Sequence, residues 1–303
     1  MSRIILLCVV CSWSVAQAAS IEAPVVGGTR VPVGKWRDVV LVVARDATCT
    51  GTLIAPDIVL TAGHCIEHEP LEVFTDTVDY GKPGGDRIKV KWSRAYPNWE
   101  RRYDVGVLML EHVARGKPRA IAAACAARQL VADGAVHVVG FGLATASGLD
   151  HNTELREANL TVVDPDCTTS EACEPSIAPR GEFVAGGHGT DTCFGDSGGP
   201  VYLDTAGGPA LIGVVSRGLG APGKPCGSEG IYVRADKVVT WIQSVTNTKL
   251  QRSTCDGPAD GEDAADGDVG GCDAGPGAGI GAGLAALVFA WRRRGRRVRA
   301  ATP

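Results

Sequence analysis

Short apolar runs separated by turn residues make up the chain between residues 25 and about 250. The runs are rich in Val, Ile and Leu, and clusters of Gly, Pro and Asp lie between them. This pattern is typical of strands joined by turns. Apolar residues at helical spacing are scarce before residues 236–249. The sequence therefore predicts an all-β domain with a C-terminal helix. The clearest strand candidates are residues 39–43, 58–60, 105–110, 136–139 and 211–215.

The N-terminal end has the pattern of an export signal. Residues 3–15 begin with Arg3 and continue as an apolar run, and Ala16-Gln17-Ala18 follows with the small-residue pattern of a cleavage site. The run is well short of the ~20 residues that a membrane span needs, so a spanning helix is the weaker interpretation. We expect a signal peptide over residues 1–18, a short pro-segment over 19–24 and a secreted protein.

The C-terminal end predicts attachment to a membrane. Residues 251–271 are rich in Gly, Asp and Ala, a composition typical of an acidic, disordered stem. Residues 274–291 contain no charged side chain, and six arginines follow between residues 292 and 299. A short membrane span with a cytoplasmic C-terminus fits this order. The folded domain would then be held at the cell surface, outside the cytoplasm.

The charge of the folded part excludes one class of partner. Residues 25–250 contain 22 Lys and Arg against 26 Asp and Glu, and 22 − 26 gives a net charge of −4. A nucleic-acid-binding domain would carry a basic surface, so we expect no nucleic-acid partner. We also expect neither a metal ion nor another cofactor.

The cysteine count fits an exported protein. Of eleven cysteines, Cys8 and Cys11 lie in the expected signal peptide, which leaves nine. Disulfides persist in the oxidising environment outside the cell. Because nine is odd, at least one cysteine has another role.

Three motifs together indicate nucleophilic catalysis. Ser197 lies in DTCFGDSGGP, residues 191–200. A serine hydroxyl needs a histidine base, and the histidine needs a carboxylate that orients it. His64 lies in LTAGHC, directly after an expected strand, and Asp104 lies in YDVGVLML, at the start of another.

These motifs resemble those of the trypsin/chymotrypsin family of serine proteases. Three further stretches resemble landmarks of the family, namely VVGG at 25–28, VVGFG at 138–142 and SRGLG at 216–220. The resemblance extends over residues 25–249. It implies two six-stranded antiparallel β-barrels and a C-terminal helix. Residues 25 to about 125 would supply His64 and Asp104, and residues from about 130 to 235 would supply Ser197.

The resemblance also implies the role of each site residue. Ser197 would attack the peptide carbonyl, His64 would transfer the proton, and Asp104 would orient His64. The backbone N–H groups of Gly195 and Ser197 would form the oxyanion hole. An ion pair would join Asp196 to the α-amino group of a chain that begins at Val25.

Cleavage after Arg or Lys follows from the residues that match the family's specificity pocket. Asp191 matches the pocket floor, and Gly218 and Gly230 match its walls. Thr192 and Ser216 also match substrate-binding positions. The implied partners are protein or peptide substrates, and we expect a monomer. The alternative is a catalytically inactive homologue that acts as a binding module at the cell surface.

Four positions depart from the family pattern, and one of them, Phe141, replaces a usual tryptophan as a change of packing. Arg217 stands where tryptophan is usual, and Phe194 is a bulky residue at the expected pocket entrance. Pro24, rather than Lys or Arg, precedes Val25, so the sequence does not identify the protease that would activate the chain.

Disulfide pairing follows in part from the same resemblance. Cys167 and Cys173 are expected to pair with each other, because Ala185 stands where the usual partner of Cys167 would be. Cys125 and Cys255 remain as a possible bridge between the barrel and the stem. The pairs expected in the domain are Cys49–Cys65, Cys193–Cys226 and Cys167–Cys173.

Cys272 is the odd cysteine. Together with Gly271, the short span and the arginines, it resembles the C-terminal sorting signal of myxobacterial surface proteins, which a membrane protease processes at the cysteine. An ordinary tail anchor with an incidental cysteine is the alternative.

Overall fold

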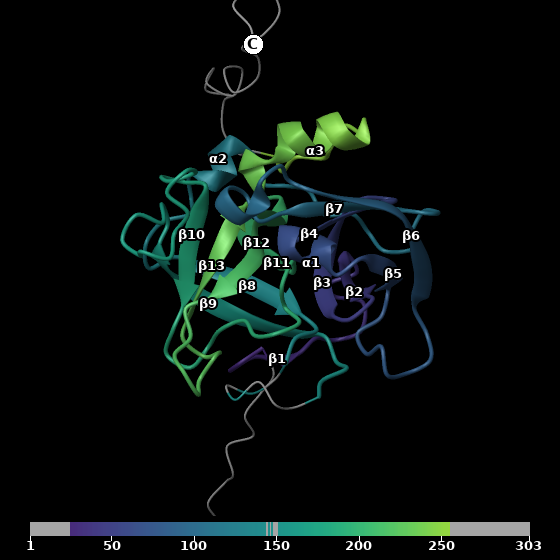
Figure 1. Ribbon diagram of the computed structural model, residues 1–303, viewed down its shortest axis with the longest axis horizontal. Coiled ribbons are helices and arrows are strands. Elements are labelled where there is room, and N and C mark those ends of the chain that lie inside the picture. The colour runs from purple at the N-terminus through teal and green to yellow at the C-terminus, as the bar shows by residue number, and fades with distance from the viewer. Residues whose placement is uncertain (1–24, 144, 146, 148–150, 255–303) are drawn as a thin grey trace, which may run out of the picture. The chain divides into compact units, whose positions relative to one another are not determined.

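Two closed β-barrels form the folded part of the chain. The computed structural model describes residues 25–143, 145, 147 and 151–254, and Figure 1 shows their course. The first barrel is closed in the order β2-β3-β4-β7-β6-β5, with antiparallel neighbours. Its strands are β2 (Val39–Ala44), β3 (Thr48–Ala55), β4 (Ile58–Thr61), β5 (Pro70–Thr75), β6 (Asp86–Ala95) and β7 (Gly106–Leu110).

The second barrel has the same number of strands. Its neighbours run in the order β9-β10-β13-β12-β11-β8, and a β8–β9 pairing closes the ring. The short strand β1 (Thr29–Arg30) pairs with β9 at its edge. Two six-stranded antiparallel barrels were expected, and the fold confirms this. The strands are β8 (Ala135–Gly140), β9 (Arg156–Asp164), β10 (Glu182–Gly186), β11 (Pro200–Thr205), β12 (Gly208–Gly218) and β13 (Glu229–Arg234).

A shared apolar cluster joins the two barrels. It contains Leu41 and Ile58 of the first barrel together with Leu211 and Val214 of the second, all 2% exposed or less. Burial of this much aliphatic surface stabilises both barrels and fixes them against each other. The site described below lies where their strands meet, so this cluster sets its geometry.

The C-terminal helix is present but shorter than the sequence predicts. Residues 236–249 were expected to be helical, whereas α3 covers Val239–Thr246. A 3₁₀ turn, η2 (Ala235–Lys237), precedes it. Asn247 adopts a left-handed conformation with φ of 51°, which ends the helix. The remaining short elements are α1 (Gly63–Glu67), η1 (Trp99–Arg101) and α2 (Ala124–Ala127).

Disulfides join Cys49 to Cys65, Cys167 to Cys173 and Cys193 to Cys226. The expectation that Ala185 stands at the position of the usual partner of Cys167 was wrong. Val184 packs against the Cys167–Cys173 bridge, whereas Ala185 points to the opposite face of β10 and packs in the core of the second barrel. Successive strand residues face opposite sides, so a shift of one residue exchanges the two environments.

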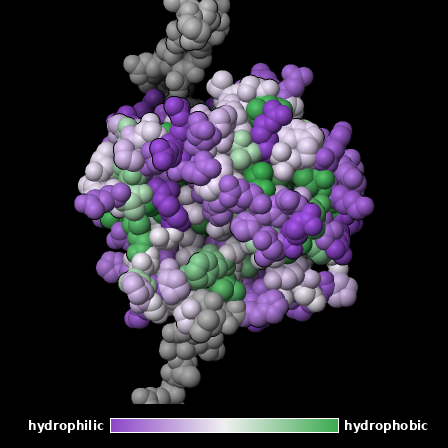
Figure 2. All heavy atoms as spheres, viewed as in Figure 1, coloured by the Kyte–Doolittle hydropathy of each residue, from purple (hydrophilic) through white to green (hydrophobic). Residues whose placement is uncertain are grey.

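Several expectations concern residues outside the described part of the chain. They are the signal peptide and pro-segment, Cys255, the stem beyond residue 254, the apolar run at 274–291 and the Gly271–Cys272 signal. The first residues of the expected stem are described and bonded to the folded domain, because the Gln251 carbonyl accepts the N–H of Ile121 and Ser253 donates its N–H to the Ile121 carbonyl, both at 2.9 Å. Within the described residues, no helix has the length and apolar character needed to cross a membrane. The face of the molecule in Figure 2 is mostly hydrophilic, with hydrophobic side chains in separate small areas.

Candidate active site

His64 and Asp104 come together at one end of an antiparallel strand pair, where Thr61 lies opposite Gly106. β4 leads into the short helix α1, which carries His64, and Asp104 lies two residues before β7, the neighbour of β4. The Nδ1 atom of His64 lies 2.9 Å from Oδ2 of Asp104. The backbone N–H of His64 donates to Oδ1 of the same carboxylate, also at 2.9 Å. Asp104 therefore fixes both the backbone and the ring of His64.

The second barrel completes the surroundings of Asp104. Ser216 on β12 donates its hydroxyl hydrogen to Oδ2 of Asp104 at 2.7 Å. Burial opposes ionisation of the carboxyl. However, the hydrogen bond and charge of His64 and the donor Ser216 outweigh it, and the pKa of Asp104 is held below its ordinary value. Asp104 is therefore a carboxylate at neutral pH, as a group that orients a histidine must be.

Ser197 lies on a turn that is bonded to the first barrel. The backbone N–H of Thr50 in β3 donates to the Ser197 carbonyl at 2.9 Å, and the Thr50 hydroxyl donates to the Gly195 carbonyl at 2.7 Å. Ser197 is half-buried. Among the described residues no hydrogen bond links its hydroxyl to His64, a contact that commonly tightens only when substrate binds.

The peptide between Phe194 and Gly195 has a defined direction. Its carbonyl, that of Phe194, accepts the N–H of Leu143 at 2.8 Å. In a trans peptide the N–H points away from the carbonyl, so the Gly195 N–H points to the opposite side. Gly195 has a φ of +94°, in the region that favours glycine. The side chain of Phe194 is 60% exposed.

Asp196 is a buried carboxyl surrounded by backbone. It accepts the N–H of Gly142 at 2.8 Å and the N–H of Cys193 at 2.9 Å. A side chain at Gly142 would begin 2.4 Å from its Cγ atom, and one at Gly140 would begin 2.1 Å from its Oδ1 atom. The glycines of the VVGFG motif therefore make room for this carboxyl. Burial raises the pKa of Asp196 to about 7, against the effect of its two N–H donors.

Val25 lies buried in the core of the second barrel, at 1% exposed. Its nitrogen belongs to a peptide bond here, because the chain continues before it. The expected ion pair between Asp196 and a free α-amino group therefore stays a prediction. The next residue, Val26, accepts the N–H of Asp191 through its carbonyl at 3.1 Å. The first residues of the domain are thus directly bonded to the motif that carries Ser197.

Asp191 is a second buried carboxyl in this motif. It is fully buried and accepts the N–H groups of Thr192 at 2.7 Å and Gly227 at 3.1 Å. Burial raises the pKa of Asp191 to about 6, while these donors act in the opposite direction. Gly218 and Gly230 face each other in the β12–β13 register. A Cβ atom at Gly230 would lie 3.3 Å from Oδ1 of Asp191.

A trypsin family model matches residues 25–242. The chain belongs to the trypsin family. Human Serine protease 56 is 29% identical over 255 residues, which is 79% of this chain and 41% of that protein. The mouse protein of the same name is 28% identical over 245 residues, or 76% of this chain and 40% of the mouse protein. The chain thus spans about two fifths of these relatives. Glucanase inhibitor protein 1 of Phytophthora sojae is 29% identical over 238 residues, 73% of this chain and 88% of that protein.

Membership of the trypsin family and the similarity to two serine proteases support a hydrolase of the serine protease type. The geometry brings His64, Asp104 and Ser216 into one hydrogen-bonded group. Thr50 of the first barrel is hydrogen-bonded to the backbone of Ser197. Sequence analysis missed Thr50. It follows Cys49 within a strand, and no motif distinguishes it from a structural threonine.

Proposed function

We propose that this trypsin-family member is a serine endopeptidase that cleaves peptide bonds after Arg or Lys. The observation that supports the triad most directly is the double contact of Asp104 with His64. It holds the ring with one nitrogen on the carboxylate and leaves the other for the Ser197 hydroxyl. His64 would accept the Ser197 proton during attack and deliver it to the leaving amine.

The oxyanion formed in that attack needs hydrogen-bond donors. In the proposed mechanism the N–H groups of Gly195 and Ser197 supply them. The contact of Phe194 with Leu143 supports this, because it turns the Gly195 N–H to the side opposite Leu143. No further rearrangement of this peptide is then needed during the reaction.

Asp191 supports the proposed preference for a basic side chain. A fully buried carboxylate that has only neutral donors among the described residues gains most from a cationic partner. Gly218 and Gly230 would leave space for the long substrate side chain, with Thr192 and Ser216 beside it. An Arg or Lys side chain would then end at Asp191.

Activation by a new N-terminus belongs to the same proposal. Cleavage before Val25 would create an α-amino group close to the Ser197 motif, and the buried carboxyl of Asp196 is paired with no cation among the described residues. An ion pair there would hold Gly195 in its donor conformation. Export through the signal peptide, and attachment to the cell surface through the C-terminal segment, place this activity outside the cytoplasm.

A second candidate function is binding without catalysis. It is favoured by the similarity to a protein named a glucanase inhibitor. Labelling with a fluorophosphonate probe separates the two functions, because the probe bonds covalently only to an activated serine. The full chain, cut before Val25, should label at Ser197 as identified by peptide mass, and Ser197→Ala should abolish labelling. A correctly folded, cut chain that is not labelled would exclude the catalytic function and support the binding function.

A further inference from the structure

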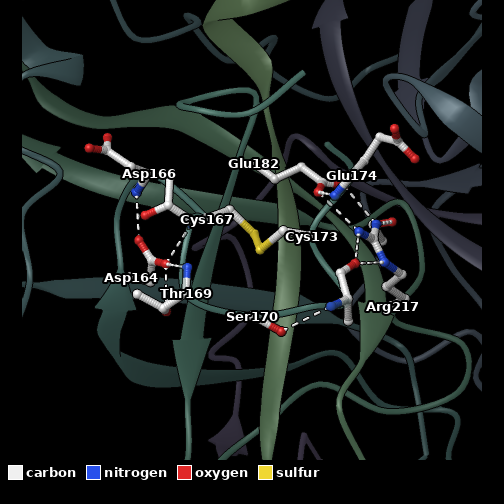
Figure 3. The surroundings of a disulfide bond; sticks show 12 residues. Asp164, Asp166, Cys167, Thr169, Ser170, Cys173, Glu174, Glu182 and Arg217 are labelled. Carbon is white, nitrogen blue, oxygen red and sulfur yellow. Dashed lines mark hydrogen bonds and ion pairs between the residues drawn. A yellow bond between two sulfur atoms is a disulfide. The ribbon is translucent and has the colours of Figure 1, made fainter. Parts of the chain in front are cut away.

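Arg217 lies beside Ser216 on β12 and forms a part-buried ion pair with Glu182 of β10. The Glu182 carboxylate is 1% exposed and the Arg217 side chain is 36% exposed. Figure 3 shows the two side chains beside the Cys167–Cys173 disulfide. An unpaired carboxylate at this depth would be costly, so Glu182 requires the arginine.

The guanidinium of Arg217 uses all of its hydrogen-bond donors within the protein. It has five N–H groups and no acceptor. Nη1 donates to Oε1 of Glu182 at 2.7 Å and to the Ser216 hydroxyl at 3.1 Å. Nη2 donates to Oε2 of Glu182 at 3.0 Å and to the Ala172 carbonyl at 2.6 Å, and Nε donates to the same carbonyl at 3.3 Å. No donor is left for a substrate carboxylate, so the contacts of this arginine point to a role inside the protein.

The hydrogen bond from Arg217 determines the direction in which the hydroxyl hydrogen of Ser216 points. The Ser216 oxygen accepts a hydrogen bond from Arg217, which has no lone pair to accept one in return. The hydroxyl hydrogen is therefore directed to the other neighbour of Ser216, Oδ2 of Asp104 at 2.7 Å. Without Arg217 the hydroxyl could rotate away, and this oxygen would then lose the Ser216 donor and keep only its contact with the His64 ring.

The loop around the disulfide holds the guanidinium in place. Ala172 lies within the loop that Cys167–Cys173 closes, and Asp164 anchors the other side of the same loop (Figure 3). Asp164 accepts four hydrogen bonds, from the backbone of Asp166, Thr168 and Thr169 and from the Thr169 hydroxyl. Arg217 is therefore fixed by a closed loop on one side and by Glu182 on the other.

We infer that Arg217 is a positioning residue for the proposed triad. It fixes the Ser216 hydroxyl on Asp104, and Asp104 in turn fixes the ring of His64. The consequence for hydrolysis rests on the proposed function, whereas the effect on the His64–Asp104 hydrogen bond does not. Arg217 itself contacts neither the reacting atoms nor, through its side-chain donors, the substrate.

A double-mutant cycle with Ser216 tests this inference. Arg217→Met combined with Glu182→Met removes the ion pair as a unit and leaves no unpaired buried charge, a replacement that proteins often tolerate. Ser216→Ala removes the hydroxyl through which Arg217 is proposed to act. Each change is made alone and combined in the full chain, cut before Val25, and thermal unfolding is measured for every variant. Arg217→Lys, which keeps a cation beside Glu182 but lacks the five-donor fork, enters the same cycle if the methionine pair does not fold.

Two readouts separate positioning from general stability. The first is hydrolysis of an acetyl-arginine amide, which has no residues for extended subsites. When Arg217 and Glu182 are replaced, we expect kcat to fall roughly three- to tenfold and KM to stay unchanged. A fall of this size corresponds to the free energy of one hydrogen bond. The second is the NMR signal of the His64 Nδ1 proton, which should shift when Asp104 loses the hydrogen bond from Ser216. In the Ser216→Ala background, neither readout should change further when Arg217 and Glu182 are replaced.

Arg180→Met is the matched control. Arg180 forms an exposed ion pair with Asp166 near the same loop but does not contact Ser216. It should leave both readouts unchanged. Equal effects of the Arg217 change with and without the Ser216 hydroxyl would overturn the positioning role. A folded wild-type chain that hydrolyses nothing would contradict the proposed protease instead, and the NMR cycle would still decide the role of Arg217.

Discussion

Asp104 contacts His64 through both of its carboxylate oxygens. Oδ1 accepts the backbone N–H of His64, and Oδ2 lies 2.9 Å from the ring Nδ1. This double contact sets the ring plane relative to the chain that carries it, and the N-terminus of β7 holds Asp104 in turn.

Replacing the nucleophile should abolish hydrolysis while the fold survives. Ser197→Ala removes one half-buried hydroxyl, whereas the carbonyl bond from Thr50 to residue 197 is retained. We expect kcat for an Arg-linked amide to fall by about 10⁶. Ser93→Ala, on β6 of the first barrel, serves as the matched control and should retain activity. Near-normal turnover by folded Ser197→Ala protein would exclude this serine as the nucleophile.

Substitution of Asp191 should change specificity rather than activity in general. Asp191→Ser removes the proposed partner of the substrate cation, so kcat/KM for Arg and Lys substrates should fall by about a hundredfold or more. Cleavage after Phe or Leu should change far less. Asp166→Ser, which removes a more exposed aspartate of the second barrel, should affect neither. Equal losses on basic and apolar substrates would mean that Asp191 does not bind the substrate side chain.

Binding of a cation should depend on the ionisation of Asp191. Its pKa is raised to about 6 in the unoccupied protein, mainly by burial. Below about pH 6 the carboxyl becomes protonated, so the affinity for benzamidine, a cationic arginine mimic, should decrease with falling pH. Above pH 7 the affinity should reach a plateau. Calorimetric titration with Ser197→Ala protein measures this without self-cleavage, and an affinity that is constant from pH 5 to pH 8 would contradict it.

The uncut chain should become less stable as the pH rises towards neutrality. The folded-state pKa values of Asp191 and Asp196, about 6 and about 7, lie above the ordinary value for aspartate. The folded chain therefore binds more protons than the unfolded chain between about pH 4 and pH 7, and the free energy of unfolding decreases across this range. The contribution of Asp196 is at most about 4 kcal/mol. Groups with lowered pKa values, such as Asp104, act only at lower pH.

Cleavage before Val25 should remove this dependence. A new α-amino group beside Asp196 would stabilise its carboxylate, so the cut chain should lose less stability between pH 5 and pH 7. A full-length Ser197→Ala chain with a specific protease site in place of residues 20–24 allows both forms to be compared by urea unfolding. The same cut in the wild-type chain should increase hydrolysis. Identical pH profiles before and after the cut would argue against the Asp196–Val25 ion pair.

The fate of the C-terminal segment can be read from the mass of the mature protein. If Gly271–Cys272 is a sorting signal, protein from the native host should end near Cys272 and lack the arginine cluster. A simple tail anchor would retain every residue to Pro303. Peptides that contain Trp291 and the following arginines, found in the surface-exposed fraction, would exclude processing at the cysteine.

Much of the fold was predictable because its signals are local. Runs such as residues 136–139 and 211–215 lie within β8 and β12, since β-branched residues between turn clusters favour strands wherever they occur. The end of α3 was not predictable from apolar spacing. Asn247 stops the helix through its backbone conformation, although Val245 and Leu250 continue an apolar pattern around it.

The site was predictable to the extent that motifs mark it. His64, Asp104, Asp191 and Ser197 each lie in a characteristic stretch of sequence. The partners of Arg217 were not predictable, because Glu182 and Ala172 lie far from it in the chain and no local pattern joins them. The same reason explains the error at Ala185. Only the pairing register of β10 shows that Val184 faces the disulfide.

The hydrogen bonds from Thr50 to Ser197 and Gly195 join a strand of the first barrel to the turn of the second barrel that carries Ser197. The proposed nucleophile and its base therefore meet only after both barrels have formed and docked. Contacts between such distant parts of a chain form late and slowly. A nascent chain with one finished barrel exposes many cleavable segments but has no assembled triad. The division of the site between two barrels would thus protect the protein from its own activity while it folds.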